Sequence, residues 1–157
     1  IFDACLMGGI EVAYQLKDPT DHILFSPTET LANGMPYSVV MQHLFSNPTD
    51  LTAVAKEYYN FYNSQTSLKY ATVSLVKTSE LENLASVAKE IFDTGRDKIS
   101  SINIRGIQRY YRGNKHWFYD LEDFLNMPSI TSWATLTVRY LFSTTKASII
   151  RCCSNLI

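Results

Sequence analysis

Residues 1–27 read IFDACLMGGIEVAYQLKDPTDHILFSP and contain the patterns from which we predict the fold class. Residues 1–4 predict the end of a buried strand that delivers Cys5 to its carboxyl-terminal tip. Apolar side chains at helical spacing then predict a helix from about residue 10 to 16, which ends in a proline-containing turn. The short apolar run at 22–25 predicts a second buried strand, parallel to the first. The order strand, helix, strand predicts a right-handed crossover.

Helices and strands continue to alternate along the rest of the chain. Further helices are expected at about 36–45, 51–62, 81–92, 104–111 and 120–125, and further strands at about 71–76, 133–142 and 147–151. Ser79 and Glu82 predict a capping box where the helix near residue 81 begins. The chain has no internal repeat, low-complexity tract or linker, so we expect residues 1–157 to belong to one α/β domain.

The composition is that of a packed globular chain. Of the 157 residues, 46% are hydrophobic and 18% are charged, which excludes a disordered protein. The 14 Lys and Arg and the 15 Asp and Glu give a net charge of −1, which argues against a dedicated nucleic-acid coat or a polybasic membrane anchor. No apolar run reaches the ~18 residues that a membrane-spanning helix needs. We therefore expect neither nucleic acid nor a membrane as a partner.

The cysteines and glycines give no sign of a metal or a cofactor. The three cysteines, Cys5, Cys152 and Cys153, are too few and too badly placed for a disulfide framework. No His pairs with Cys152 and Cys153 in the spacing of a zinc site. The chain also contains no P-loop and no glycine-rich phosphate motif. We expect no metal and no cofactor.

Cys5 is the first candidate for chemistry. It is predicted at the carboxyl end of a strand, before Gly8, Gly9 and a helix, in the crevice where open α/β sheets collect ligands. Free N–H groups at such a helix start can hold an oxyanion. The alternative is a buried structural cysteine, since a free cysteine is commonly a small core residue. A cysteine nucleophile also needs a base, usually a histidine that the fold brings close in space.

A basic cluster in the second half of the chain allows another interpretation. Its members are Arg96, Lys98, Arg105, Arg109, Arg112 and Lys115, against the single acid Asp97, with Tyr110 and Tyr111 between them. Basic residues interleaved with aromatic ones are one mark of a nucleic-acid patch. The alternative is a solvated helix face, which the acidic remainder of the chain favours because it cancels the local charge.

A series of motifs runs through most of the chain. They are FDACLMG at 2–8, EVAYQLK at 11–17, FSPTE at 25–29 and NGMPY at 33–37, followed more loosely by YATVS at 70–74 and FYDLEDF at 118–124. Together they strongly resemble the clostripain family of cysteine peptidases. The resemblance implies a caspase-like α/β/α sandwich with a mostly parallel central sheet, whose upstream strands would be missing from this chain. It also implies a secreted or periplasmic endopeptidase that cuts polypeptides after Arg or Lys.

The same resemblance assigns roles to individual residues. Cys5 matches the nucleophile of the family, and its backbone N–H would help to form the oxyanion hole. Asp3 matches the acid at the base of the S1 pocket, where a carboxylate suits a substrate Arg or Lys; the alternative for Asp3 is an N-terminal cap of the following helix. Ser26 and the loop to Tyr37 would border this pocket. Asn33 stands where relatives often carry a second acid, so one negative charge of the pocket would be missing.

The resemblance places the histidine base outside this chain. In the family it comes from a His-Gly block upstream of the Ala-Cys strand, and no His-Gly occurs here. We assign no role to His22, His43 or His116, because a lone histidine is more often a packed or solvated residue. We expect Ile1 to be a processing or engineered boundary. The resemblance implies a precursor that cleaves itself into light and heavy chains that stay together, with the catalytic His on the light-chain segment. The competing hypothesis is a non-catalytic α/β binding or scaffold domain that retains the peptidase fold.

Overall fold

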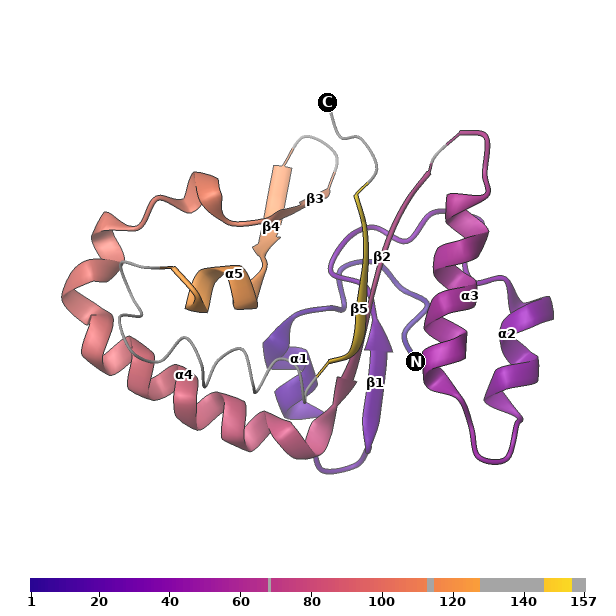
Figure 1. Ribbon diagram of the computed structural model, residues 1–157, viewed down its shortest axis with the longest axis horizontal. Helices are drawn as coiled ribbons and strands as arrows, with labels where there is room; N and C mark the ends of the chain where they lie inside the picture. Colours follow the sequence, from indigo (N-terminus) through magenta and orange to yellow (C-terminus); the bar gives the residue numbers. More distant parts are fainter. Residues whose placement is uncertain (68, 113–114, 128–145, 154–157) are drawn as a thin grey trace.

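The computed structural model describes residues 1–67, 69–112, 115–127 and 146–153 (Figure 1). The helices are α1 (Ile10–Gln15), α2 (Tyr37–Leu44), α3 (Leu51–Asn63), α4 (Leu81–Gly95) and α5 (Leu121–Leu125). The strands are β1 (His22–Phe25), β2 (Tyr70–Lys77), β3 (Arg109–Arg112), β4 (Lys115–Tyr119) and β5 (Lys146–Cys153), and short 3-10 helices span Thr78–Glu80, Arg96–Ser101 and Ile104–Gly106. The strand expected at 133–142 lies outside the described residues.

The main sheet has the strand order β1-β2-β5. Both pairings are antiparallel, with Leu24 opposite Leu75 and Val73 opposite Ile150. This differs from the mostly parallel sheet that we expected. The reason lies in the connection from β1 to β2, because it contains two packed helices, α2 and α3, joined by a short loop. A helical hairpin returns the chain to the end of the sheet that it left, whereas a single crossover helix would carry it to the other end.

The segment that carries Cys5 lies along the free edge of β1. Phe2 N–H donates to Leu24 O at 2.8 Å, and Leu6 N–H donates to Thr28 O at 3.0 Å. Because both partners advance along the chain in the same direction, this segment runs parallel to β1. Residues 1–4 form no regular strand of their own. Residues 22–25 therefore have the parallel neighbour that we expected, but it is an irregular segment held by hydrogen bonds and not a strand.

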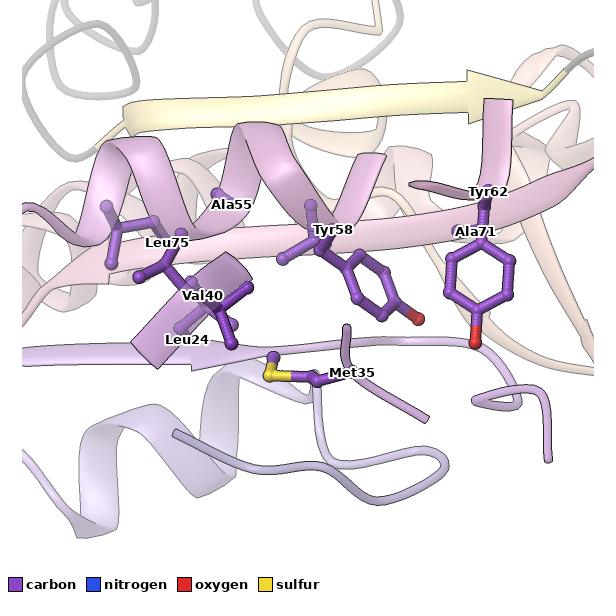
Figure 2. Packing of buried hydrophobic residues seen from close by; sticks show 10 residues of the cluster. Leu24, Met35, Val40, Ala55, Tyr58, Tyr62, Ala71 and Leu75 are labelled. Atoms are coloured by element: carbon purple, nitrogen blue, oxygen red, sulfur yellow. The ribbon is translucent and has the colours of Figure 1, made fainter. Parts of the chain in front are cut away.

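Apolar side chains gather on both faces of the main sheet, because successive side chains of a strand point to opposite sides. On one face, Leu24 and Leu75 meet α2 and α3; the whole cluster is Leu24, Met35, Val40, Val54, Ala55, Tyr58, Tyr62, Ala71, Val73 and Leu75 (Figure 2). On the other face, Ile23 and Phe25 meet α1, α4 and α5; that cluster is Ala13, Ile23, Phe25, Leu81, Leu84, Ile91 and Leu125. Helices therefore cover both faces of the sheet (Figure 1).

Two local predictions are wrong. The helix expected at 104–111 is a 3-10 turn followed by β3, which pairs with β4 in an antiparallel hairpin. Aromatic residues on both sides of a Gly-Asn dipeptide are typical of a hairpin, and this signal outweighed the helical spacing. The capping box is also absent: α4 begins at Leu81 without a side-chain cap. The Glu82 carboxylate instead accepts a 2.5 Å hydrogen bond from Tyr14 Oη on α1.

Candidate functional site

Cys5 lies in a turn at the surface, next to the loop that follows β1. Its side chain is exposed, so the alternative of a buried structural cysteine is wrong. Thr30 N–H donates to Cys5 Sγ at 3.3 Å, and the thiol donates to Thr30 O at 3.6 Å. The sulfur is therefore held against one peptide group of the loop and remains open to solvent on its other side.

The backbone around Cys5 is tightly constrained. Leu6 has a φ of 62°, in the left-handed region that a bulky residue rarely adopts. Its N–H bond to Thr28 O helps to hold this conformation. At Gly8, a Cβ atom would lie only 2.4 Å from Pro27 N, so the chain can approach β1 this closely only without a side chain. These contacts fix the path of the backbone on the carboxyl-terminal side of Cys5.

The helix after Cys5 starts at the predicted position, Ile10. α1 has Gly9 at its N-cap and no side-chain cap bond. Asp3 is therefore not the cap of this helix, which removes the alternative role for its carboxylate. Because residues 6–9 separate Cys5 from α1, the first turn of the helix does not directly follow the thiol.

Asp3 is instead bound by the loop that leads into α2. Its Oδ2 atom accepts a 2.6 Å hydrogen bond from Tyr37 Oη and a 3.4 Å bond from Met35 N–H. The bond to the carboxylate raises the pKa of Tyr37 above its ordinary value. Asp3 itself is exposed. Its carboxylate is thus anchored through one oxygen and accessible from solvent.

The loop is held in turn by α3. Tyr62 Oη donates to Gly34 O at 2.8 Å, and Gly34 adopts a φ of 61°, which glycine accepts without steric cost. A Cβ atom at Gly34 would lie 3.1 Å from Asp3 Oδ2. Asn33 is exposed beside this turn, and its side chain forms no hydrogen bond with another described residue. The fold therefore brings Asp3 and residues 33–37 together.

Ser26 lies beneath this arrangement and is only 4% exposed. Its Oγ atom lies 2.8 Å from Thr72 Oγ1 and accepts a bond from Thr28 N–H at 3.2 Å, so it links β1 to β2. Ser26, Thr72, Asp3 and Tyr58 are among the residues that line a cavity of about 10 Å³, which is room for one water molecule. Burial raises the pKa of Tyr58. A long basic side chain does not fit this cavity and would have to reach Asp3 from its solvent side.

Two of the three histidines lie at ends of their elements that do not meet Cys5 or Asp3. His22 begins β1, whereas the Cys5 turn bonds to Thr28, beyond the other end of that strand. His43 lies in the last turn of α2, whereas Tyr37, which meets Asp3, lies in the first. His116 belongs to β4. That none of the three histidines is the base stays a prediction.

Three other kinds of site were considered from the sequence. Among the described residues, no three His, Cys, Asp or Glu side chains are grouped closely enough to hold a metal ion. No described helix has the length and apolar character needed to cross a bilayer. The basic residues 96–115 are spread over 3-10 turns and the β3-β4 hairpin, so they do not form the helix face that we considered. Arg96 lies 3.8 Å from Asp93.

Sequence patterns did not identify three residues that organise this region. They are Thr30, Tyr37 and Tyr62, which contact Cys5, Asp3 and the Gly34 carbonyl. Tyr37 was named only as the end of a motif and of the loop that borders the pocket, and a tyrosine following Gly-Met-Pro gives no sign of which carboxylate it will meet. The ring of Tyr62 lies in the apolar cluster beside α3, but its hydroxyl has a polar partner.

Comparison with known proteins gives a consistent result. The model of the clostripain family matches residues 1–153. A cysteine protease from B. fragilis is 29% identical, with a TM-score of 0.82 over 94% of this chain and 64% of that one. An inactive zymogen C11 protease from Parabacteroides distasonis is 30% identical, with a TM-score of 0.78 over 94% of this chain and 42% of that one.

A third structure was solved with a ligand. It is a clostripain from Bacteroides thetaiotaomicron in complex with the peptide inhibitor BTN-VLTK-AOMK, 26% identical, with a TM-score of 0.75 over 98% of this chain and 73% of that one. No curated protein matches the sequence. The chain spans less than two thirds of the B. fragilis and P. distasonis proteins.

Proposed function

The chain belongs to the clostripain family, and from this we propose that it is the Cys-bearing part of a cysteine endopeptidase that cleaves after Arg or Lys. The observation that carries the proposal is the pairing of an exposed thiol with an exposed, anchored carboxylate two positions earlier. Cys5 would attack the scissile carbonyl, and Asp3 would bind the basic side chain before it. The inhibitor bound by the B. thetaiotaomicron relative has a peptide that ends in K, which supports a basic preference.

The chemistry follows from the groups around the thiol. A histidine base takes the Cys5 proton, the sulfur attacks the carbonyl carbon, and the same histidine protonates the leaving amine. Water then attacks the thioester, which releases the acid product and restores the thiol. Leu6 N–H is already bonded to Thr28 O, whereas Cys5 N–H has no backbone acceptor among the described residues. Cys5 N–H is therefore our candidate donor to the oxyanion.

We propose that the base comes from a segment outside residues 1–157. Relatives of the chain are longer, and one of them is a zymogen, which supports a precursor that is processed into associated chains. In this arrangement the described layers are part of a caspase-like α/β/α sandwich, and further parallel strands extend its sheet. A relative described as a secreted C11 cysteine protease supports secretion of this protein as well.

The substrate pocket would be shallow and singly charged at this end. Asp3 supplies one carboxylate, and the neutral Asn33 stands where relatives often carry another. Ser26 would form part of the pocket floor from beneath, without contacting the substrate cation, because it is buried against Thr72. The affinity for a basic side chain would then depend mainly on Asp3.

The test measures cleavage of peptides that carry Arg or Lys before the scissile bond, in the natural full-length protein and its processed form. Cys5→Ala is expected to abolish cleavage. Asp3→Asn is expected to lower kcat/KM for these peptides at least about tenfold, while a peptide with a neutral residue there loses less. Asp18→Asn is the matched control, since Asp18 is also exposed but contacts Lys17. Full activity of Cys5→Ala would sink the proposal.

The second candidate is a non-catalytic binding domain with the same fold. The lack of a His-Gly block in residues 1–157 and the neutral Asn33 favour it. A thiol-reactive probe with an arginine side chain separates the two, because it needs a formed pocket as well as a free thiol. If an excess of the Arg peptide prevents the probe from labelling Cys5, the result supports the peptidase. If the arginine probe labels Cys5 no faster than a probe with a neutral side chain does, the result supports the binding domain.

A further inference from the structure

Tyr37 is the residue that ties Asp3 to the body of the protein. Its hydroxyl donates the shorter of the two hydrogen bonds to Asp3 Oδ2, at 2.6 Å, and Met35 N–H donates the other at 3.4 Å. We propose that Tyr37 is a positioning residue, which fixes the Asp3 carboxylate so that its second oxygen meets the basic side chain of the substrate. This inference rests on the proposed function.

The geometry leaves one oxygen free for the substrate. Both hydrogen bonds that the Asp3 carboxylate accepts from described residues are made to Oδ2, and the side chain is exposed. Both donors are neutral, so they orient the carboxylate without cancelling its charge. An unanchored aspartate at the surface would sample several rotamers, and part of the binding energy of the substrate would then be lost in ordering it.

Tyr37 can act in this way because its own backbone is fixed. It occupies the first turn of α2, directly after the buried Met35 and Pro36. Tyr62 of α3 holds the preceding turn through Gly34 O. The side chain of Tyr37 is nevertheless 49% exposed, so core packing accounts for little of its role. Removing only the hydroxyl should therefore leave the fold intact.

The experiment compares a peptide with Arg before the scissile bond and the same peptide with citrulline, its uncharged isostere. We expect Tyr37→Phe to lower the ratio of the two kcat/KM values about tenfold, equivalent to about 1.4 kcal/mol. The loss should appear in KM for the Arg peptide, while kcat for the citrulline peptide stays unchanged. In an Asp3→Asn background, Tyr37→Phe should have no further effect on the ratio, because the group that it orients has lost its charge.

Tyr14→Phe is the matched control. It removes another bond from a tyrosine hydroxyl to a carboxylate, that of Tyr14 to Glu82, between α1 and α4 on the other face of the sheet. For Tyr14→Phe, the ratio of kcat/KM for the Arg peptide to that for the citrulline peptide should equal the wild-type ratio. Thermal unfolding of Tyr14→Phe and Tyr37→Phe checks that both variants are folded.

The outcomes separate the two proposals. If Asp3→Asn lowers the ratio and Tyr37→Phe leaves it unchanged, or lowers both kcat/KM values equally, the positioning role is overturned and the proposed function stands. If the wild-type protein shows no Cys5-dependent cleavage, the proposed function is overturned, and this inference with it.

Discussion

At the scale of single residues, the turn beside Asp3 requires a glycine at position 34. We expect Gly34→Ala to destabilise the protein by about 1 kcal/mol, because an alanine would have to adopt a left-handed φ. Its Cβ atom would also press on Asp3 Oδ2, so discrimination between Arg and citrulline peptides should fall. Urea unfolding and the peptide assay measure the two effects.

Gly106 provides the control for this prediction. A Cβ atom there would meet nothing within 4 Å. Gly106→Ala should therefore change the free energy of unfolding by no more than about 0.5 kcal/mol and should leave the discrimination between Arg and citrulline peptides unchanged. Equal stability of the two variants would contradict the role given to the turn at Gly34.

The residue scale is also where sequence reasoning reached furthest and then stopped. Cys5 and Asp3 could be selected because a short motif carries them, and both are exposed as a reacting or binding group must be. Thr30 and Tyr37 could not be paired with them, since those contacts depend on how residues 28–36 fold back over the Cys5 turn. Ser26 was selected as a pocket residue, but its hydroxyl is used within the fold.

At the scale of elements, α3 supports the site from below through one hydroxyl. We expect Tyr62→Phe to destabilise the protein by about 1 kcal/mol, because the Gly34 carbonyl loses its donor. The turn that supports Asp3 should then become more mobile, which hydrogen exchange at Met35 N–H would measure as faster exchange.

Tyr59→Phe on the same helix is the control. The ring of Tyr59 is half-buried, and its hydroxyl forms no hydrogen bond with a described residue. In this variant, the exchange rate at Met35 should equal that of the wild type. If the two variants exchanged equally fast there, α3 would not hold the turn through Tyr62.

Most elements could be predicted because their signals are local. Asp50 caps α3 and Asp120 caps α5, each through its own carboxylate, and β1 is a short apolar run between turns. The β3-β4 hairpin was missed because its strands are short and their aromatic residues also fit a helical spacing. The antiparallel sheet was missed because strand direction depends on whether one helix or two intervene, and the sequence predicted both helices without showing that they pack as a hairpin.

At the scale of the whole molecule, one sheet is shared by the two apolar clusters. β1 contributes Leu24 to one cluster and Ile23 and Phe25 to the other. The two clusters therefore pack on opposite faces of the same strand, so a loss of packing on one face also weakens the support of the other. We infer that the two described faces of the sheet unfold together, and this is testable by one substitution on each face.

Leu75→Ala on β2 and Leu84→Ala on α4 empty equally buried positions in the two clusters, since both side chains are at most 3% exposed. Each is expected to cost about 2–5 kcal/mol and to lower the midpoint of one common thermal transition, followed by far-UV and near-UV circular dichroism. Phe45→Ala is the control, because Phe45 is 82% exposed and its loss should leave the midpoint nearly unchanged. Two separate transitions, each sensitive to only one of the leucines, would show that the faces fold independently. The Cys5 turn bonds to the backbone of β1 and after it, so a common transition would also mean that the site is lost when either face is weakened.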